Sequence, residues 1–286
     1  LEFRRVLFRS VENLVDVLFV DEAAQMSLAN VIVSSQGARS LVLIGDPQQL
    51  EQPLKGSHPE GTDQSSLDHV LGASETIASD HGLFLDTSFR LSPDICRFTS
   101  ELFYEGRLQA LPENEKQVLD GPLPYAGSGL IYVPVQHEGN QNQSNEEAEA
   151  IATIFATLTK GEYSFVYNKG TSNLLKPEDV LIVAPYNLQV YKLRKRIPKA
   201  RVGTVDKFQG QEAPVVIYSL TSSSQYDAPR GMEFLYSLNR LNVATSRAKA
   251  MCIIVGSEKL FFPSCLTPRQ IQLANAFCRY RELNQI

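Results

Sequence analysis

Short apolar runs recur along the chain and predict buried strands, because strands covered on both faces read as nearly continuous hydrophobic stretches. Between them lie segments with helical spacing, such as 145–158, where Ile151, Ile154 and Leu158 share one face. Strands that alternate with helices are typical of a parallel α/β sheet. The predicted strands are 15–20, 41–45, 82–85, 130–135, 180–184, 214–220 and 250–256.

The remaining segments complete this α/β pattern. Ser144, followed three residues later by Glu147, predicts a capping box at the start of the helix 145–158. We place a boundary near residue 80, with a short α/β part before it (11–80) and a complete α/β domain after it (81–286). Further helices are predicted at 187–196, 234–249 and 269–282, and loops at 111–129 and 137–145.

Composition excludes several classes of protein. The 286 residues hold 27 Lys and Arg against 32 Asp and Glu, so the chain is not a broadly basic nucleic-acid binder. It is too apolar for a disordered tail, and no apolar run reaches the roughly 18–20 residues that cross a bilayer. The four Cys have no zinc-like spacing, which favours reduced thiols in a cytoplasmic protein.

The first ten residues, LEFRRVLFRS, stand apart from the rest of the chain. They carry three Arg, lack an initiator Met and fit no secretory signal. They resemble translated adaptor or vector sequence, so we expect 1–10 to be non-native. The alternative is a basic edge of a real strand.

Two carboxylates, Asp21 and Glu22, directly follow the apolar run 15–20. The carboxyl edge of an open α/β sheet is where ligands bind, so both side chains are expected there. Asp21 could hold Mg²⁺ directly or through water, and Glu22 could orient and deprotonate an attacking water. The alternative is a solvated Asp-Glu helix cap.

A second polar turn follows the run 41–45. Gly45 permits unusual backbone conformations and Pro47 fixes the turn, so Gln48 and Gln49 emerge beside the first strand. A Gln amide can sense a γ-phosphate or its attacking water, since it donates and accepts without adding charge. The alternative is an ordinary turn with surface Gln.

These segments together resemble a known family. DEAAQ (21–25) followed by GDPQQLEQP (45–53) is similar to motifs II and III of superfamily I helicases, in the 5′-to-3′ branch that includes nonsense-decay RNA helicases and the eukaryotic replication nuclease-helicase. DPQQLEQP, GSHPEG (56–61) and SELFYEGRL further resemble bacterial proteins that fuse a RecB-like nuclease to this helicase. Later motifs follow in family order: TSFRLSP (87–93), VLIVAPYNLQV (180–190), VGTVDKFQGQEAPVVI (202–217) and LNVATSRAKAMCIIVG (241–256).

The resemblance implies a P-loop NTPase with RecA-like parallel sheets, using ATP and Mg²⁺. Arg90 and Arg247 match the two arginines that reach the γ-phosphate from the second RecA-like domain, and a guanidinium fork suits phosphate oxygens. Gln49 matches the motif III glutamine. Glu212 matches a residue that accepts a hydrogen bond from the nucleotide ribose, and Gly210 would let the backbone approach there. For each arginine the alternative is a surface salt bridge.

For nucleic acid, Thr204 matches a hydroxyl that contacts a backbone phosphate, and Tyr186 could stack or pack near the strand. The family threonine before Tyr186 is Ala184 here, so one hydroxyl contact is absent. A basic run between 192 and 201 could attract a strand, but we favour a solvated helix face. The resemblance implies single-stranded nucleic acid, DNA rather than RNA, as a partner.

One element of such an NTPase is missing. None of the 17 glycines is followed by Lys, so the phosphate-cradling loop G-x-x-x-x-G-K-[ST] is absent. We therefore expect a C-terminal piece of an ATP-dependent helicase, with a truncated first RecA-like domain and a complete second one, whose other partner is the N-terminal portion of the same protein. The alternative is a catalytically inactive fragment or a nucleic-acid-binding module.

Overall fold

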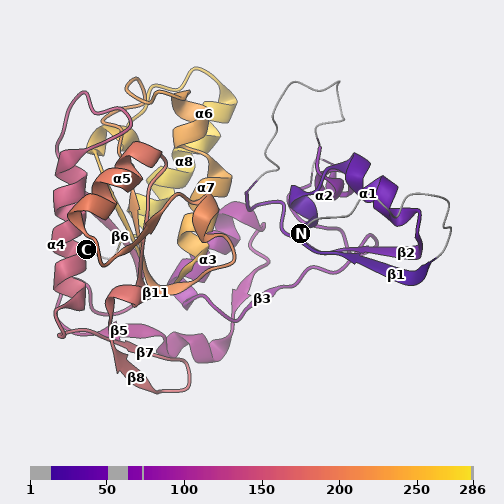
Figure 1. The fold of residues 1–286 in the computed structure, drawn as a ribbon, viewed down its shortest axis with the longest axis horizontal. Helices are drawn as coiled ribbons and strands as arrows, with labels where there is room; N and C mark the ends of the chain where they lie inside the picture. Colours follow the sequence, from indigo (N-terminus) through magenta and orange to yellow (C-terminus); the bar gives the residue numbers. More distant parts are fainter. Residues whose placement is uncertain (1–13, 51–63, 73, 285–286) are drawn as a thin grey trace. The chain divides into compact units, whose positions relative to one another are not determined.

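The structure is a computed structural model that describes residues 14–50, 64–72 and 74–284. The chain divides into two compact units, with the division between Phe84 and Leu85 (Figure 1). The segment 1–10 and the GSHPEG motif at 56–61 lie outside the described residues. Within the described ranges, no helix is both long and apolar enough to cross a membrane.

The first unit is built on a pair of parallel strands, β1 (Val15–Val20) and β2 (Ala38–Leu43). Helices α1 (Leu28–Ser35) and α2 (Ser66–Leu71) accompany them. A small apolar cluster joins the end of β1 to these helices and contains Val20, Ala23, Ala24, Val31 and Leu67.

The strands of the first unit are less buried than their apolar sequences predict. In β1 only Val20 is buried, and the side chain of Phe19 is 64% exposed. The described residues of the first unit include only two short helices, and these do not cover both faces of the strand pair. The strand predicted at 82–85 does not form either, and this segment has no ladder partner in the described chain.

The second unit contains a five-stranded parallel sheet in the order β10-β9-β11-β12-β6. Every residue of β9 and β11 is buried, which explains their continuous apolar sequences. The predicted α/β class with parallel strands is thereby confirmed. The strands are β6 (Gly129–Pro134), β9 (Val180–Val183), β10 (Arg201–Gly203), β11 (Ala213–Ser219) and β12 (Ala248–Gly256).

Helices cover both faces of this sheet (Figure 1). One face packs against α4 (Asn145–Thr159) and α5 (Asn187–Arg196), which share a core with alternate residues of the central strands. The other carries α3 (Pro93–Phe103), α7 (Leu238–Ser246) and α8 (Pro268–Glu282), where the Tyr280 hydroxyl donates to the carbonyl of Cys252 at 2.6 Å.

Two predicted segments differ from the structure. The helix predicted at 234–249 is two helices, α6 (Gly231–Leu235) and α7, separated by Tyr236 and Ser237. Ser237 accepts a hydrogen bond from Arg240 N and so begins a new helix, and the chain after Ser246 joins β12. The predicted loop 111–129 contains a 3-10 helix, Pro112–Lys116, and a strand. That strand, β5 (Val118–Asp120), forms an antiparallel sheet with β7 (Ser164–Val166) and β8 (Ser172–Leu174). A separate two-stranded sheet is formed by β3 (Thr87–Ser88) and β4 (Gln109–Ala110).

Only half of the predicted capping box forms at the start of α4. Ser144 Oγ accepts from Glu147 N at 3.0 Å, but the backbone N–H of Ser144 donates to Gln189 Oε1 instead of Glu147. The Glu147 side chain is fully buried and turns toward the sheet, where its carboxylate accepts from His137 Nε2 at 2.9 Å. It also accepts from Ser219 Oγ at 2.5 Å.

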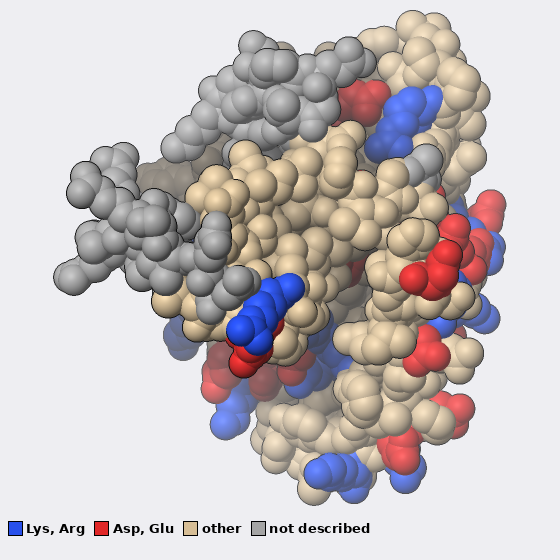
Figure 2. All heavy atoms as spheres, turned by 90° about the vertical axis from the view of Figure 1, so that its right-hand side faces the viewer, with Lys and Arg blue, Asp and Glu red and all other residues tan. Residues whose placement is uncertain are grey.

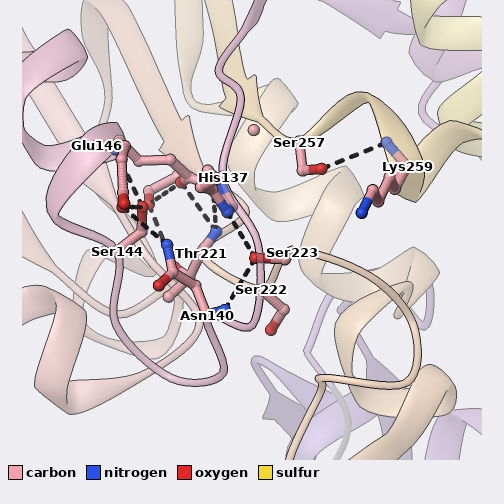
Figure 3. Close-up of polar contacts among 12 residues, drawn as sticks. His137, Asn140, Ser144, Glu146, Thr221, Ser222, Ser223, Ser257 and Lys259 are labelled. Atoms are coloured by element: carbon pink, nitrogen blue, oxygen red, sulfur yellow. Dashed lines mark hydrogen bonds and ion pairs between the residues drawn. The ribbon is translucent and has the colours of Figure 1, made fainter.

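The same carboxylate holds the backbone that follows β11. Both Glu147 oxygens lie 2.9 Å from the N–H of Thr221, a β-branched residue at φ 74°. A left-handed conformation costs such a residue of order 1–3 kcal/mol and persists only where its surroundings enforce it. His137 extends the network to Ser223 Oγ at 2.7 Å, which also accepts from Asn140 N (Figure 3).

We predict that Glu147→Ala destabilises the chain by about 3 to 5 kcal/mol, because it leaves buried His137 and the Thr221 N–H without their shared acceptor. Urea unfolding followed by circular dichroism measures this. Glu146→Ala, which removes the exposed neighbouring carboxylate, should change stability by less than about 1 kcal/mol. Equal effects of the two substitutions would contradict the prediction.

Candidate functional site

In the first unit, Asp21 and Glu22 lie where β1 ends, as their position after the apolar run predicts. Asp21 Oδ1 accepts from the N–H of Glu22 at 2.9 Å, and Glu22 is left-handed, with φ 53°. Both residues are exposed. The turn therefore presents two carboxylates at the carboxyl edge of the strand pair.

The turn after β2 lies against the turn after β1 at the same edge. A Cβ on Gly45 would stand 2.9 Å from Ala23 N, so the approach requires glycine. The N–H of Ala23 donates to the carbonyl of Ile44 at 2.9 Å, which joins the two turns. Asp46 Oδ2 accepts from Gln49 Nε2 at 2.9 Å, so Gln49 is oriented by a carboxylate that the sequence analysis had not selected.

In the second unit, the structure brings together two of the predicted residues from distant parts of the sequence. Arg90 Nε lies 2.6 Å from Glu212 Oε2, and Arg90 Nη1 donates to the carbonyl of Ser246 at 3.2 Å. Lys249 Nζ lies 2.6 Å from the other oxygen, Glu212 Oε1. Glu212 thus bridges two cations where β11 and β12 begin.

Arg247 directly precedes β12, beside this cluster. Its carbonyl accepts from Ala213 N at 3.0 Å, and its side chain is buried, with the residue 4% exposed. Gly210 lies at φ 74°, and among the described residues other than its chain neighbours no atom stands within 4 Å of where its Cβ would be. Glycine is therefore favoured at this position because of its positive φ, and not because a neighbouring atom leaves no room for a side chain.

The two cations act on the acidity of Glu212. Partial burial of the carboxyl raises its pKa, but the hydrogen bonds and charges of Lys249 and Arg90 outweigh burial and hold the pKa below its ordinary value. The carboxylate therefore stays ionised, and able to accept hydrogen bonds, at neutral pH.

The predicted nucleic-acid residues lie at the opposite edge of the same sheet. Thr204 follows β10, and its carbonyl accepts from Lys207 N at 3.1 Å. Tyr186 follows β9 and is only 7% exposed. Its ring centroid lies 5.5 Å from that of Phe234, at an interplanar angle of 38°, so it packs inside the unit instead of forming an open stacking surface.

Much of the basic run between 192 and 201 is engaged inside the unit. Arg194 donates through Nε and Nη2 to the carbonyl of Val202, and Arg196 forms a two-bond pair with Glu149. On the face drawn in Figure 2, positive and negative side chains are interspersed and form no broad field of one sign. Arg194 and Arg196 therefore already have protein partners within the second unit.

Sequence reasoning missed Lys249 and Asp46. Both were within quoted motifs, yet only the pairing of β11 with β12 places Lys249 beside Glu212, and only the turn geometry points Asp46 at Gln49. Position in the chain gave no signal for either contact.

A protein-family model described as "AAA domain" matches residues 63–259. The relatives of the chain are helicases of superfamily I, related to the regulators of nonsense transcripts. The chain belongs to this AAA-domain helicase family. Its α/β unit is therefore a RecA-like, helicase-type domain.

Individual relatives agree with this family. The chain is 31% identical to the ATP-dependent helicase upf1 of Schizosaccharomyces pombe, over 88% of the chain and 27% of the relative. It is 29% identical to the regulator of nonsense transcripts 1 homolog of Drosophila melanogaster, over 85% of the chain and 21% of the relative. The chain thus spans about a quarter of the length of these helicases. Among solved structures, the chain is similar to the arterivirus nonstructural protein 10 helicase in complex with DNA. The match covers 95% of this chain and 43% of that one, at 15% sequence identity and a TM-score of 0.44.

We predict that Glu212→Gln destabilises this helicase domain at neutral pH but not in acid. Because folding lowers the pKa of Glu212, its ion pairs stabilise the fold fully above the ordinary value of 4.5, and this contribution is lost as the pH falls through the folded pKa. The effect should not exceed about 1 kcal/mol, since the side chain is 40% exposed.

Urea midpoints of wild type and variant, measured at pH 7 and well below pH 4.5, test this expectation. The difference between the two proteins should shrink in acid. Glu113→Gln, which neutralises an exposed carboxylate of the same unit, is the matched control, and a midpoint difference that persists in acid would contradict the prediction.

Proposed function

We propose that the chain is part of an ATP-dependent nucleic-acid helicase that couples ATP hydrolysis to movement along a single strand. The observation that carries the proposal is the cluster at the amino ends of β11 and β12. There Glu212 orients the Arg90 guanidinium, and Arg247 directly precedes the neighbouring strand β12. Arginines held in this way suit the charge that develops in phosphoryl transfer.

The residues present fit ATP and Mg²⁺. Asp21 and Glu22 are exposed carboxylates, the ligand type that Mg²⁺ prefers, and they share a sheet edge with Gln49. When bound, ATP would supply the phosphoanhydride bond whose hydrolysis to ADP and phosphate is exergonic, and Mg²⁺ would offset part of the negative charge of the phosphates.

We assign roles to the residues of each unit separately. Asp21 holds Mg²⁺ directly or through water, Glu22 accepts the proton of the attacking water, and Gln49 senses the γ-phosphate. Arg90 and Arg247 bind γ-phosphate oxygens. Glu212 accepts a hydrogen bond from the ribose. Because each of its two oxygens is paired with a cation, one of these ion pairs has to break for this hydrogen bond to form. Gly210 supplies the turn before Glu212.

For the nucleic acid we propose a single strand that contacts the carboxyl edge of the sheet at Thr204, with Tyr186 beneath it. We propose DNA rather than RNA as the bound strand, because motif details such as DPQQLEQP resemble those of bacterial proteins that fuse a nuclease to a helicase. We also propose that the same protein contains a nuclease domain. Two relatives are named for nonsense transcripts, so RNA is the comparison to include in the experiment.

A second candidate function rests on one observation. None of the 17 glycines is followed by Lys, so the chain lacks its own phosphate-cradling loop. Phosphoryl transfer depends on positioning and charge stabilisation, and their loss should remove nearly all turnover. By itself the chain would then be inactive toward ATP and bind only nucleic acid.

We expect Glu22→Gln to abolish ATP turnover while leaving ATP binding largely intact, in a protein that joins this chain to a phosphate-cradling loop. The amide keeps the shape of the side chain but cannot accept the proton of the attacking water. Steady-state ATPase rates and nucleotide binding measure the two properties. Glu75→Gln, an exposed carboxylate of the same unit, is the control, and normal turnover by Glu22→Gln would refute the assignment.

An ATPase assay on the 286-residue chain, with and without single-stranded DNA or RNA, tests whether the chain by itself is inactive. We expect no turnover by the chain itself. Strand-stimulated turnover would instead exclude the inactive alternative, and the stronger stimulant would identify the preferred nucleic acid.

A further inference from the structure

A pair of arginines flanks one aromatic ring close to Thr204. The guanidinium carbon of Arg230 lies 3.9 Å from the ring centroid of Phe234, and that of Arg240 lies 4.3 Å from the same centroid. The Tyr186 ring packs against Phe234 as well. The ring therefore orients two cations by cation–π contact at the edge of the sheet where we place the strand.

The charges of the two arginines are not equally balanced. Arg240 is largely buried and lies 3.6 Å from the carboxylate of Asp206, two residues after Thr204. Arg230 is exposed, and within the described part of the second unit no carboxylate lies within ion-pair distance of it. Asp206 therefore balances Arg240 alone, and within the described part of the second unit Arg230 is the cation of this pair that has no carboxylate partner.

The segment that leads to Arg230 is anchored at its start. Thr221, the second residue after β11, is held in its left-handed conformation by the buried Glu147 carboxylate. Ser222 Oγ donates to the carbonyl of Gln141, in the segment after β6. Ser223 Oγ accepts from the N–H of Asn140 in the same segment (Figure 3). Phe234 then fixes the guanidinium of Arg230 at the far end of the same segment.

We propose that Arg230 binds a backbone phosphate of the single strand next to the phosphate at Thr204. One face of the guanidinium lies on Phe234, and its N–H donors remain available around the edge, an arrangement that suits phosphate oxygens. The arginines at 194, 196 and 201 differ, because their guanidinium groups donate to Val202, Glu149, and Glu178 and Gln211 respectively. This site rests on the nucleic-acid part of the proposed function.

Fluorescence anisotropy of a labelled single-stranded oligothymidylate, titrated with the 286-residue chain at several NaCl concentrations, tests the site. Arg230→Ala should raise Kd about three- to tenfold at low salt, and should lower the slope of log Kd against log salt by about 0.7, the value for one phosphate contact on a single strand. Arg230→Lys keeps the charge, so it should keep the slope and weaken binding less.

Arg269→Ala removes one exposed arginine from α8 and is the matched control for net charge. It should leave both the affinity and the slope unchanged. Wild-type affinity and slope in Arg230→Ala, or an equal loss in Arg269→Ala, would overturn the Arg230 site and leave the helicase proposal standing. Failure of the wild-type chain to bind the strand would overturn both the site and the nucleic-acid part of the proposed function.

Discussion

Burial of the central strands on both faces is the constraint that organises the second unit. Every residue of β9 and β11 is inaccessible, and helices cover the sheet on either side. Strand interiors under such a constraint accept few polar side chains, because each would need a buried partner. The chemistry of the domain is therefore confined to the residues just before and just after each strand.

The two ends of the strands carry different chemistry as a result. The amino ends of β11 and β12 gather Glu212, Lys249 and the guanidinium of Arg90 in a partly exposed ion-pair cluster. At the carboxyl edge, the Glu147 carboxylate accepts buried hydrogen bonds from the backbone N–H of Thr221 and so fixes the backbone there. A rigid backbone reduces the conformational entropy that a flexible side chain on the same segment would lose when it binds a ligand.

Much of this arrangement could be predicted from sequence, because the strongest signals are local. Buried strands such as β11 have apolar runs, and the helix at 187–196 has both the predicted bounds and the predicted type. Glu147 shows where local reasoning stops. Its spacing from Ser144 predicts a surface cap, but the cap is only half formed since a buried histidine and the end of β11 compete for the carboxylate. Those partners are distant in sequence, and no local pattern identifies them.

The segment from Thr204 to Glu212 shows how closely the two edges are joined. It leaves the carboxyl end of β10, passes an ion pair between Asp206 and Arg240, turns at Gly210 and enters the amino end of β11. Because Asp206 balances Arg240 beside Phe234, the ring that orients Arg230 lies at the end of the same chain of contacts.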